Sequence, residues 1–178
     1  MNKYYTNNYP IINVYKKTSL KSEIVTQMIY GESFKIINEL SQWMKIRIKE
    51  DGYTGYLKKR KFNSYLEPTH KISVLYSNIY KNSNFKKKVG KLSYASKIKV
   101  EKINGRFAKF QNKWIETKNI KPIKFKNKNF FKDIKKFIGV KYKWGGKTFA
   151  GIDCSALIQV CLNFNNKSFP RDTGQQIN

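Results

Sequence analysis

The sequence predicts a mostly β protein with a shorter α+β part at its C-terminal end. Short alternating apolar runs broken by turn residues fill residues 13–62, and a similar pattern returns over residues 72–123. Helical spacing of apolar residues begins only in the last third of the chain. These observations predict two small β-barrels, over residues 1–64 and 65–123, followed by a helical segment over residues 124–178.

The first barrel is predicted from short strands that turn residues separate. One turn is expected at Gly31 and another at Glu50-Asp51-Gly52. Five short strands in about fifty residues favour a closed barrel, because closure leaves no strand edge exposed. The apolar residues that mark these strands include Val25, Met28, Tyr30, Phe34, Ile36, Ile37, Trp43, Met44, Ile46, Ile48, Tyr53, Tyr56 and Leu57.

The second barrel is predicted from a diverged copy of the same pattern. After a short linker that contains Pro68, apolar runs recur as far as Ile123. The closing sequence Lys113-Trp114-Ile115 lies where the first barrel has Gly55-Tyr56-Leu57, which indicates an internal repeat. The stretch from Lys81 to Lys91 is a basic cluster, for which a solvated loop is the simplest interpretation.

Helical spacing predicts the elements of the last segment. The segment is expected to contain a helix from Asp153 to Phe164, its second. Asp172 and Gln175 have the spacing of a capping box at the start of a further helix. The first helix of the segment is expected over residues 129–138, ending at Gly139 and packing into the core. Its apolar residues are Phe130, Phe131, Ile134, Phe137 and Ile138.

Cys154 stands where a glycine-rich loop turns into the helix predicted from Asp153. The loop contains Gly145, Gly146 and Gly151, and an apolar run follows the cysteine. A helix N-terminus carries partial positive charge and free N–H groups, which lower the pKa of a thiol and stabilise an oxyanion. Cys154 is therefore a candidate nucleophile, and a small core residue is the alternative interpretation.

The motifs around Cys154 resemble a known family. The order Y-x-W-G-G, G-x-D-C-S, apolar helix and P-R-D-x-x-x-Q, over about forty residues, resembles the NlpC family of bacterial cell-wall cysteine peptidases, which have a papain-like fold. Ala156 departs from the glycine that is usual there. In the first barrel, Y-G-E-x-F, W-x-K-I-R and D-G-Y-x-G-Y resemble the SH3-like domain of the γ-D-glutamyl-L-diamino acid endopeptidases (dipeptidyl-peptidase VI-like).

This resemblance implies a substrate and a mechanism. Members of that subfamily cleave free muropeptides with an N-terminal L-Ala, between γ-D-Glu and the diamino acid, through a thiolate that forms an acyl-enzyme. By resemblance, Asp153 and Asp172 recognise the terminal ammonium, with support from Ser155 and Thr173. An N-cap for Asp153 and the capping box for Asp172 are the alternative interpretations.

The resemblance also assigns an aromatic residue of the first barrel to the end of the cleft. Tyr53 matches that position best and Tyr56 is the second choice, although ordinary barrel surface explains either residue as well. No metal cluster or phosphate-binding loop is visible in the sequence, so no cofactor is implied.

The catalytic base that the family requires is not found after Cys154. The family places a histidine beyond the nucleophile helix, whereas the single histidine here is His70, between the two predicted barrels. The sequence is therefore expected to be the front part of a longer enzyme and to be inactive by itself. A non-catalytic protein that binds peptidoglycan peptides is the alternative.

The charge of the chain is strongly positive. Lys and Arg number 37 against 11 Asp and Glu, which gives a formal net charge of +26. This excess predicts attraction to polyanions. The lysines are spread along the whole length and no nucleic-acid motif is present, so only non-specific binding to nucleic acid is expected.

The cysteines and the N-terminal sequence indicate the cellular compartment of the protein. Cys154 and Cys161 are seven residues apart in one predicted helix, about 10 Å along its axis, too far for a disulfide. Reduced thiols favour a reducing compartment.

The sequence contains no signal-peptide pattern and no apolar run of membrane-spanning length. A cytoplasmic location is expected, or a periplasmic or extracellular one if the N-terminus is incomplete; the oligomeric state is not predicted.

Overall fold

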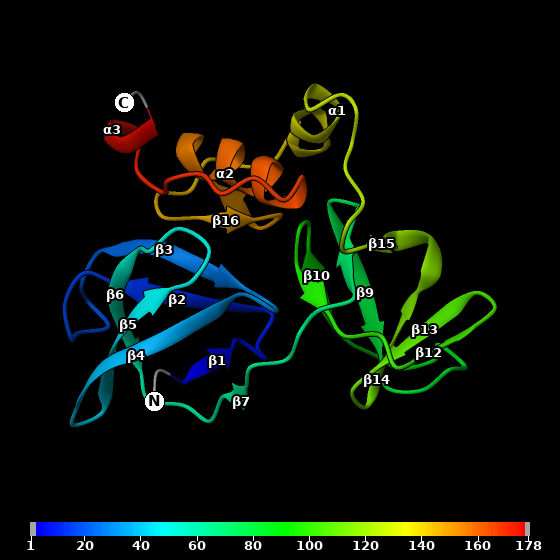
Figure 1. Ribbon diagram of the computed structural model, residues 1–178, viewed down its shortest axis with the longest axis horizontal. Helices are drawn as coiled ribbons and strands as arrows, with labels where there is room; N and C mark the ends of the chain where they lie inside the picture. Colours follow the sequence, from blue (N-terminus) through cyan, green and yellow to red (C-terminus); the bar gives the residue numbers. More distant parts are fainter. Residues whose placement is uncertain (1–2, 177–178) are drawn as a thin grey trace.

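The structure, a computed structural model, describes residues 3–176 of the chain. Figure 1 shows two β units side by side, with the helices and strand β16 lying above them. The first unit holds the strands up to residue 64, the second holds those of residues 70–122, and the helices come last in the chain. The predicted fold class, mostly β with a C-terminal α+β part, is confirmed.

The first β unit is one seven-stranded antiparallel sheet, in the order β3-β2-β6-β5-β4-β1-β7. Along β5, Met44, Ile46 and Ile48 are buried while the residues between them face outward, as the two-residue period of a strand requires. The described end strands β3 and β7 do not pair with each other, so the barrel is open along one side and not closed as predicted. The strands are β1 (Tyr4–Thr6), β2 (Ile11–Tyr15), β3 (Ile24–Ile29), β4 (Ser33–Leu40), β5 (Trp43–Ile48), β6 (Thr54–Lys58) and β7 (Asn63–Ser64).

The second β unit contains a five-stranded sheet, in the order β10-β9-β14-β13-β12, and a three-stranded sheet, β11-β8-β15. Its buried core includes Tyr30 from the first unit, whose ring meets that of Phe110 edge-on at 6.0 Å. The two units therefore share apolar packing. The strands are β8 (His70–Ile72), β9 (Tyr76–Tyr80), β10 (Lys88–Ser93), β11 (Lys97–Ile98), β12 (Lys102–Asn104), β13 (Phe107–Phe110), β14 (Lys113–Glu116) and β15 (Ile120–Pro122), with a 3₁₀ turn at Thr117–Asn119.

The first helix is shorter and more polar than the sequence predicts. Helix α1 covers only Phe131–Ile134 and continues as a 3₁₀ turn, Lys135–Phe137, before Gly139 adopts a φ of +83°. Phe131 and Ile138 are 69% and 79% exposed, so their predicted place in the core is wrong. The buried position next to them belongs to Asp133, whose carboxylate accepts hydrogen bonds from Asn127, Lys136 and Asn165. A carboxylate paired in this way fills a place that the apolar pattern assigns to a hydrophobic side chain.

The second predicted helix is confirmed as α2, Cys154–Phe164, and it packs against both β units. Its buried face includes Val160 and Phe164, which belong to one apolar cluster with Ile29 of the first unit and Tyr94 of the second. Short strands β16 (Lys147–Thr148) and β17 (Gly151–Ile152) precede it, and α3 (Thr173–Gln176) follows. The N-terminus of α2 is thereby fixed relative to the first barrel.

Two ion pairs connect the first β unit with the C-terminal segment and with the second β unit. Lys147 of β16 is fully buried and its Nζ lies 2.6 Å from Oε1 of Glu32, in the turn between β3 and β4. Lys97 of β11 pairs with Glu50 of the first unit at 3.0 Å. Because each pair bridges two parts of the chain, the three parts form one connected unit.

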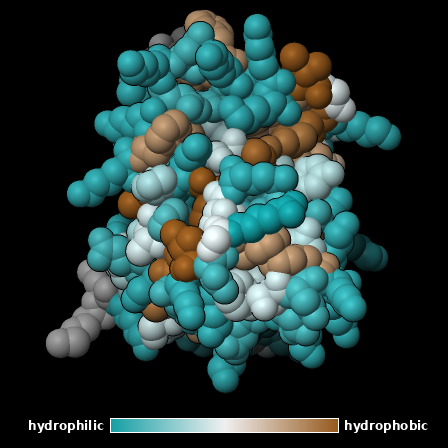
Figure 2. Space-filling view, turned by 90° about the vertical axis from the view of Figure 1, so that its right-hand side faces the viewer, coloured by the Kyte–Doolittle hydropathy of each residue, from teal (hydrophilic) through white to brown (hydrophobic). Residues whose placement is uncertain are grey.

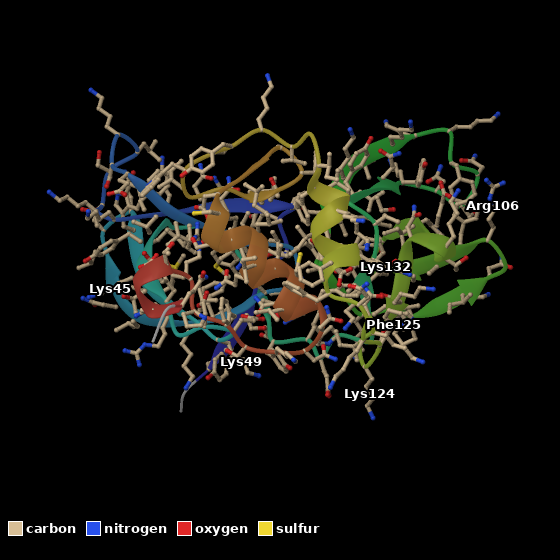
Figure 3. The ribbon with its side chains drawn as sticks, turned by 90° about the horizontal axis from the view of Figure 1, so that it is seen from above. Lys45, Lys49, Arg106, Lys124, Phe125 and Lys132 are labelled. Carbon is tan, nitrogen blue, oxygen red and sulfur yellow. The ribbon has the colours of Figure 1, made fainter. Side chains whose placement is uncertain are left out.

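The surface is hydrophilic and basic. Figure 2 shows the side of the second β unit covered mostly by hydrophilic side chains. Lys45 and Lys49 lie on the first unit, and Arg106 lies on the opposite side of the molecule (Figure 3).

Within residues 3–176, no helix is long and apolar enough to cross a membrane, and no group of His, Cys, Asp and Glu is arranged to hold a metal ion.

Candidate active site

Cys154 is the first residue of α2, and its side chain is exposed. Asp153 is the N-cap: its backbone is extended, and its Oδ1 accepts a hydrogen bond of 2.8 Å from the N–H of Ala156. The glycine-rich loop before it lies against the first barrel. At Gly145, where φ is +67°, a Cβ atom would come within 2.2 Å of the carbonyl oxygen of Ile24. Only glycine fits this approach.

The carboxylate of Asp153 is saturated by protein groups. Arg171 is buried, and its guanidinium holds both oxygens, with Nη2–Oδ2 at 2.5 Å and Nη1–Oδ1 at 3.1 Å. The N–H of Gly145 and the hydroxyl of Ser155 donate to the same carboxylate. Asp153 therefore holds the loop, the helix N-terminus and Arg171 together, and its predicted contact with a substrate ammonium stays a prediction.

Arg171 is anchored in turn to the first barrel. Its Nε donates a hydrogen bond of 2.7 Å to Oγ1 of Thr26, which is fully buried in β3. The next residue, Gln27, accepts a hydrogen bond of 3.0 Å from the backbone N–H of Lys147. Strand β3 thus supports the site from behind, a role that no pattern in the sequence indicates.

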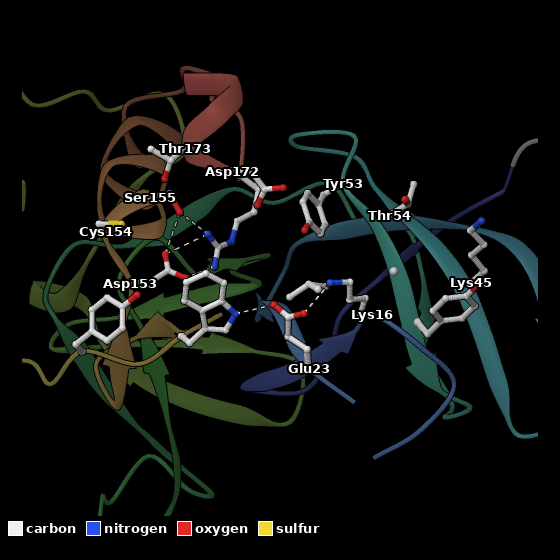
Figure 4. Close-up of a pocket in the computed structure, with 16 residues that line it drawn as sticks. Lys16, Glu23, Lys45, Tyr53, Thr54, Asp153, Cys154, Ser155, Asp172 and Thr173 are labelled. Atoms are coloured by element: carbon white, nitrogen blue, oxygen red, sulfur yellow. Dashed lines mark hydrogen bonds and ion pairs between the residues drawn. The ribbon is translucent and has the colours of Figure 1, made fainter. Parts of the chain in front are cut away.

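A cleft of about 710 Å³ opens between the helices and the first barrel (Figure 4). The predicted site residues all line it, so segments far apart in the sequence come together here. The sequence analysis gave no role to several other lining residues, among them Trp144, Glu23 and Lys16. The predicted residues in the cleft are Tyr53, Tyr56, Asp153, Cys154, Ser155, Asp172 and Thr173.

Tyr53 and Asp172 face each other across the cleft (Figure 4). Burial, together with the negative charge of Asp172, raises the pKa of Tyr53 to about 12. The phenol therefore keeps its proton at neutral pH and is available as a hydrogen-bond donor or acceptor. Asp172 itself is exposed, in contrast to Asp153. It precedes α3, where its backbone carbonyl accepts from the N–H of Gln175.

Trp144 and Glu23 form a bridge between the two sides of the cleft. The indole Nε1 of Trp144 donates a hydrogen bond of 2.9 Å to Glu23, whose other oxygen lies 3.0 Å from Nζ of Lys16. Hydrogen bonds from Lys16 and Trp144 lower the pKa of Glu23. Trp144 belongs to the Y-x-W-G-G motif, but its partner lies 121 residues away in the sequence, so only the folded chain shows the pair.

His70 does not line the cleft. It lies in β8 of the second β unit, where its Nδ1 is 2.9 Å from the hydroxyl of Thr69, and burial lowers its pKa. Among the described residues that line the cleft there is no histidine.

Comparison with known proteins agrees with this architecture. Residues 14–62 match the bacterial dipeptidyl-peptidase SH3 domain, and residues 139–178 match the NlpC/P60 family. The resemblance predicted from the motifs is therefore confirmed: the first barrel matches the dipeptidyl-peptidase SH3 domain, and the segment that contains Cys154 matches the NlpC/P60 family.

Individual relatives point to the same group of proteins. The chain is 28% identical over 173 residues to the gamma-D-glutamyl-L-lysine dipeptidyl-peptidase of Bacillus subtilis, covering 86% of this chain and 57% of that protein. It is 22% identical over 182 residues to the protein of the same name from Bacillus cereus, covering 87% and 54%. It is 23% identical over 188 residues to dipeptidyl-peptidase 6 of Lysinibacillus sphaericus, covering 90% and 69%. The chain thus spans little more than half the length of the first two relatives.

A solved structure shows the same fold. The crystal structure of an NlpC/P60 family protein from Bacillus cereus superposes with a TM-score of 0.84 at 15% sequence identity, covering 97% of this chain and 76% of that one. The arrangement of the β units and the cysteine helix is therefore shared with a protein of very different sequence.

Proposed function

We propose that this protein is a cysteine peptidase acting on peptides derived from peptidoglycan, at the bond between γ-D-glutamate and a diamino acid. The observation that carries the proposal is the exposed Cys154 at the N-terminus of α2, in a cleft that it shares with Asp172 and Tyr53. The names of the two Bacillus relatives support the γ-D-glutamyl-L-lysine bond as the substrate type.

The chemistry follows from the position of the thiol. The thiolate of Cys154 attacks the carbonyl carbon, and the electron pair moves to the oxygen, where N–H groups at the start of α2 stabilise the negative charge. Collapse of this adduct releases the amine of the diamino acid and leaves a thioester, which water hydrolyses. A general base must accept and return the proton, and His70, in the second β unit, is not placed to do so.

The other end of the cleft provides recognition of a free N-terminus. Asp172 is exposed and faces the neutral phenol of Tyr53, so a substrate ammonium between them gains a charge-assisted hydrogen bond. Asp153 contributes from behind by holding Arg171 and Ser155 in place. The substrate class that fits is a short muropeptide whose N-terminal L-Ala is unblocked.

The proposal is tested with L-Ala-γ-D-Glu-L-Lys and the protein purified from its source, unchanged or carrying Cys154→Ala. Binding is measured by calorimetry, and cleavage by the appearance of free lysine. With the protein at its natural length, we expect both variants to bind the peptide and only the unchanged protein to cleave it, while the control Cys161→Ala retains cleavage. Cleavage by Cys154→Ala would show that the nucleophile is wrongly assigned. Binding without cleavage by the unchanged protein would favour a peptide-binding protein that is not an enzyme.

A further inference from the structure

A second groove, of about 340 Å³, lies on the first barrel beside the cleft that contains Cys154. It is lined by residues of strands β3, β2 and β6, which are neighbours in the sheet (Figure 1), and by Lys143 of the glycine-rich loop. This loop separates the groove from the cleft, because Tyr142 and Trp144 line the cleft whereas Lys143 between them lines the groove. The proposed function gives the groove no role.

Three cations line the groove. Lys58 is the last residue of β6, Arg60 follows shortly after it, and the side chain of Lys143 lies against Gly151, where a Cβ atom would come within 2.6 Å of Cβ of Lys143. Among the described residues, none of the three cations forms an ion pair, and the groove is lined by no aspartate or glutamate. Charges of one sign around a groove add their fields, so the groove attracts a ligand with several negative charges.

Two hydrogen-bonded amides add a donor to the groove. The backbone N–H of Lys147 donates a hydrogen bond of 3.0 Å to Oε1 of Gln27, which fixes the orientation of this buried amide. Nε2 of Gln27 then donates, at 2.9 Å, to Oδ1 of Asn13. The Nδ2 of Asn13 is 3.5 Å from the hydroxyl of Tyr15, at the limit of a hydrogen bond. Asn13 therefore has N–H groups, and not its oxygen, to offer a ligand.

The sheet brings this donor and the cations to the same side. Tyr15 of β2 pairs with Tyr56 of β6 in the antiparallel register. Asn13 and Lys58 are each two residues from this pair, so both lie on the same face as it does. Both side chains line the groove, so a single ligand can contact both.

We propose that this groove binds a diphosphate group, either as the free ion or as part of a small molecule. The three cations pair with phosphate oxygens, and Asn13 donates a further hydrogen bond. A diphosphate carries several negative charges and many acceptor oxygens, which match a lining of donors and cations, and the planar guanidinium of Arg60 suits a phosphate group. The inference does not depend on the proposed function, because it involves neither Cys154 nor the residues of the cleft.

The test uses inorganic pyrophosphate as the probe and the unchanged protein at low salt, with binding measured by calorimetry. We expect one pyrophosphate to bind per chain, about tenfold more tightly than orthophosphate, and more weakly at high salt. Lys58→Gln and Lys143→Gln should each weaken binding by about three- to tenfold. Lys143→Arg keeps the charge and should retain binding. Asn13→Asp replaces the donor by a carboxylate and should weaken binding at least as much as Lys58→Gln.

A matched control is Lys132→Gln, which removes the same charge from an exposed position on α1, outside the groove. This variant should bind pyrophosphate as the unchanged protein does. Equal weakening by Lys132→Gln would show that the attraction comes from the net charge alone and would overturn the inference. Binding that does not saturate, or that Asn13→Asp and Lys143→Gln leave unchanged, would overturn it too.

A parallel titration with uridine diphosphate distinguishes the two sources of the group. Tighter binding of uridine diphosphate than of pyrophosphate, lost in Lys143→Gln, would assign the site to a diphosphate carried by a small molecule. Tighter binding of pyrophosphate, lost in the same variant, would assign it to the free ion.

Discussion

Asp153 and Asp172 line the same cleft but differ in exposure and in their hydrogen-bond partners. Asp153 is 7% exposed and accepts hydrogen bonds from the backbone and from Arg171, whereas Asp172 is exposed to the cleft. A carboxylate that protein donors already saturate gains little from a ligand, because a new bond must replace an existing one. Of the two, Asp172 is therefore the residue for which we propose recognition of a substrate ammonium.

At this residue scale we expect Asp172→Asn to weaken binding of L-Ala-γ-D-Glu-L-Lys by about tenfold, because the ammonium loses its ion pair with the carboxylate and keeps at most a hydrogen bond to a neutral amide oxygen. The same change should leave the N-acetylated peptide, which has no ammonium group, almost unaffected. Calorimetry on the Cys154→Ala background measures both. The control Glu39→Gln removes an exposed carboxylate of β4 and should change neither. Equal losses for both peptides would exclude recognition of the ammonium by Asp172.

The reactivity of the two cysteine thiols also depends on their surroundings. Cys154 and Cys161 lie on one helix, yet Cys154 is exposed in the cleft and Cys161 is buried in the apolar cluster beneath α2. Burial raises the pKa of Cys161 to about 12, so its thiol stays protonated and unreactive at neutral pH. Both cysteines are free. The position of each along α2, not the residue type, decides which one can act as a nucleophile.

At the scale of elements, the N-terminus of α2 is held by side chains from three segments. Asp153 caps the helix, Arg171 comes from the segment before α3, and Thr26 comes from β3 of the first barrel. All three are buried, so each depends on the others for its hydrogen bonds. The helix that carries Cys154 is therefore positioned by tertiary contacts as well as by its own cap.

The element-scale prediction concerns this arrangement. Arg171→Met should lower the free energy of unfolding by about 3–5 kcal/mol, because it leaves the carboxylate of Asp153 buried without a charged partner. The milder Thr26→Val, which removes only one acceptor, should cost about 1–3 kcal/mol. Urea denaturation followed by circular dichroism measures both. The control Lys167→Met changes an exposed cation and should have almost no effect. Losses below 1 kcal/mol for both buried variants would contradict the arrangement.

At the scale of the whole molecule, Lys71 ties the second β unit to the far end of α2. It is 1% exposed, and its Nζ donates to the carbonyls of Phe125, at 2.6 Å, and of Phe164, the last residue of α2. The carbonyl end of a helix carries partial negative charge, which favours a cation there. Burial outweighs this attraction and, together with the charge of Lys97, lowers the pKa of Lys71 to about 8.

This lowered pKa predicts a pH dependence of stability. Between about pH 8 and pH 10.5, the unfolded chain keeps the proton on Lys71 and the folded protein has lost it. The unfolded state binds more protons there, so the contribution of Lys71 to stability rises with pH in this window. The free energy of unfolding of the unchanged protein, relative to Lys71→Met, should rise from pH 8 to pH 10.5.

Chemical denaturation at pH 7, 8, 9 and 10 measures this difference. The control Lys121→Met removes an exposed lysine of the neighbouring strand β15 and should not reproduce this rise. A difference for Lys71→Met that is constant, or that falls with rising pH, would contradict the assigned direction of the pKa shift.

The sequence by itself determined the elements whose signals are local. Alternation of apolar residues marked the strands of the first barrel, because a strand buries every second side chain. The glycine-rich loop followed by Asp153, Cys154 and an apolar run marked α2 and its cap, because capping depends only on neighbouring residues. The same motifs predicted the match of residues 139–178, which include Cys154, to the NlpC/P60 family.

Only the tertiary structure decided what depends on contacts between distant segments. Asp133 with its polar partners is buried where the apolar pattern predicts Phe131 and Ile138, and the end strands β3 and β7 of the first sheet do not pair. Trp144 bonds to Glu23, which is 121 positions away in the sequence. Lys45 lines the same cleft as Cys154, about a hundred positions away. Spacing along the chain carries no information about such contacts, because the burial and charge around each side chain are set by whichever segments fold against it.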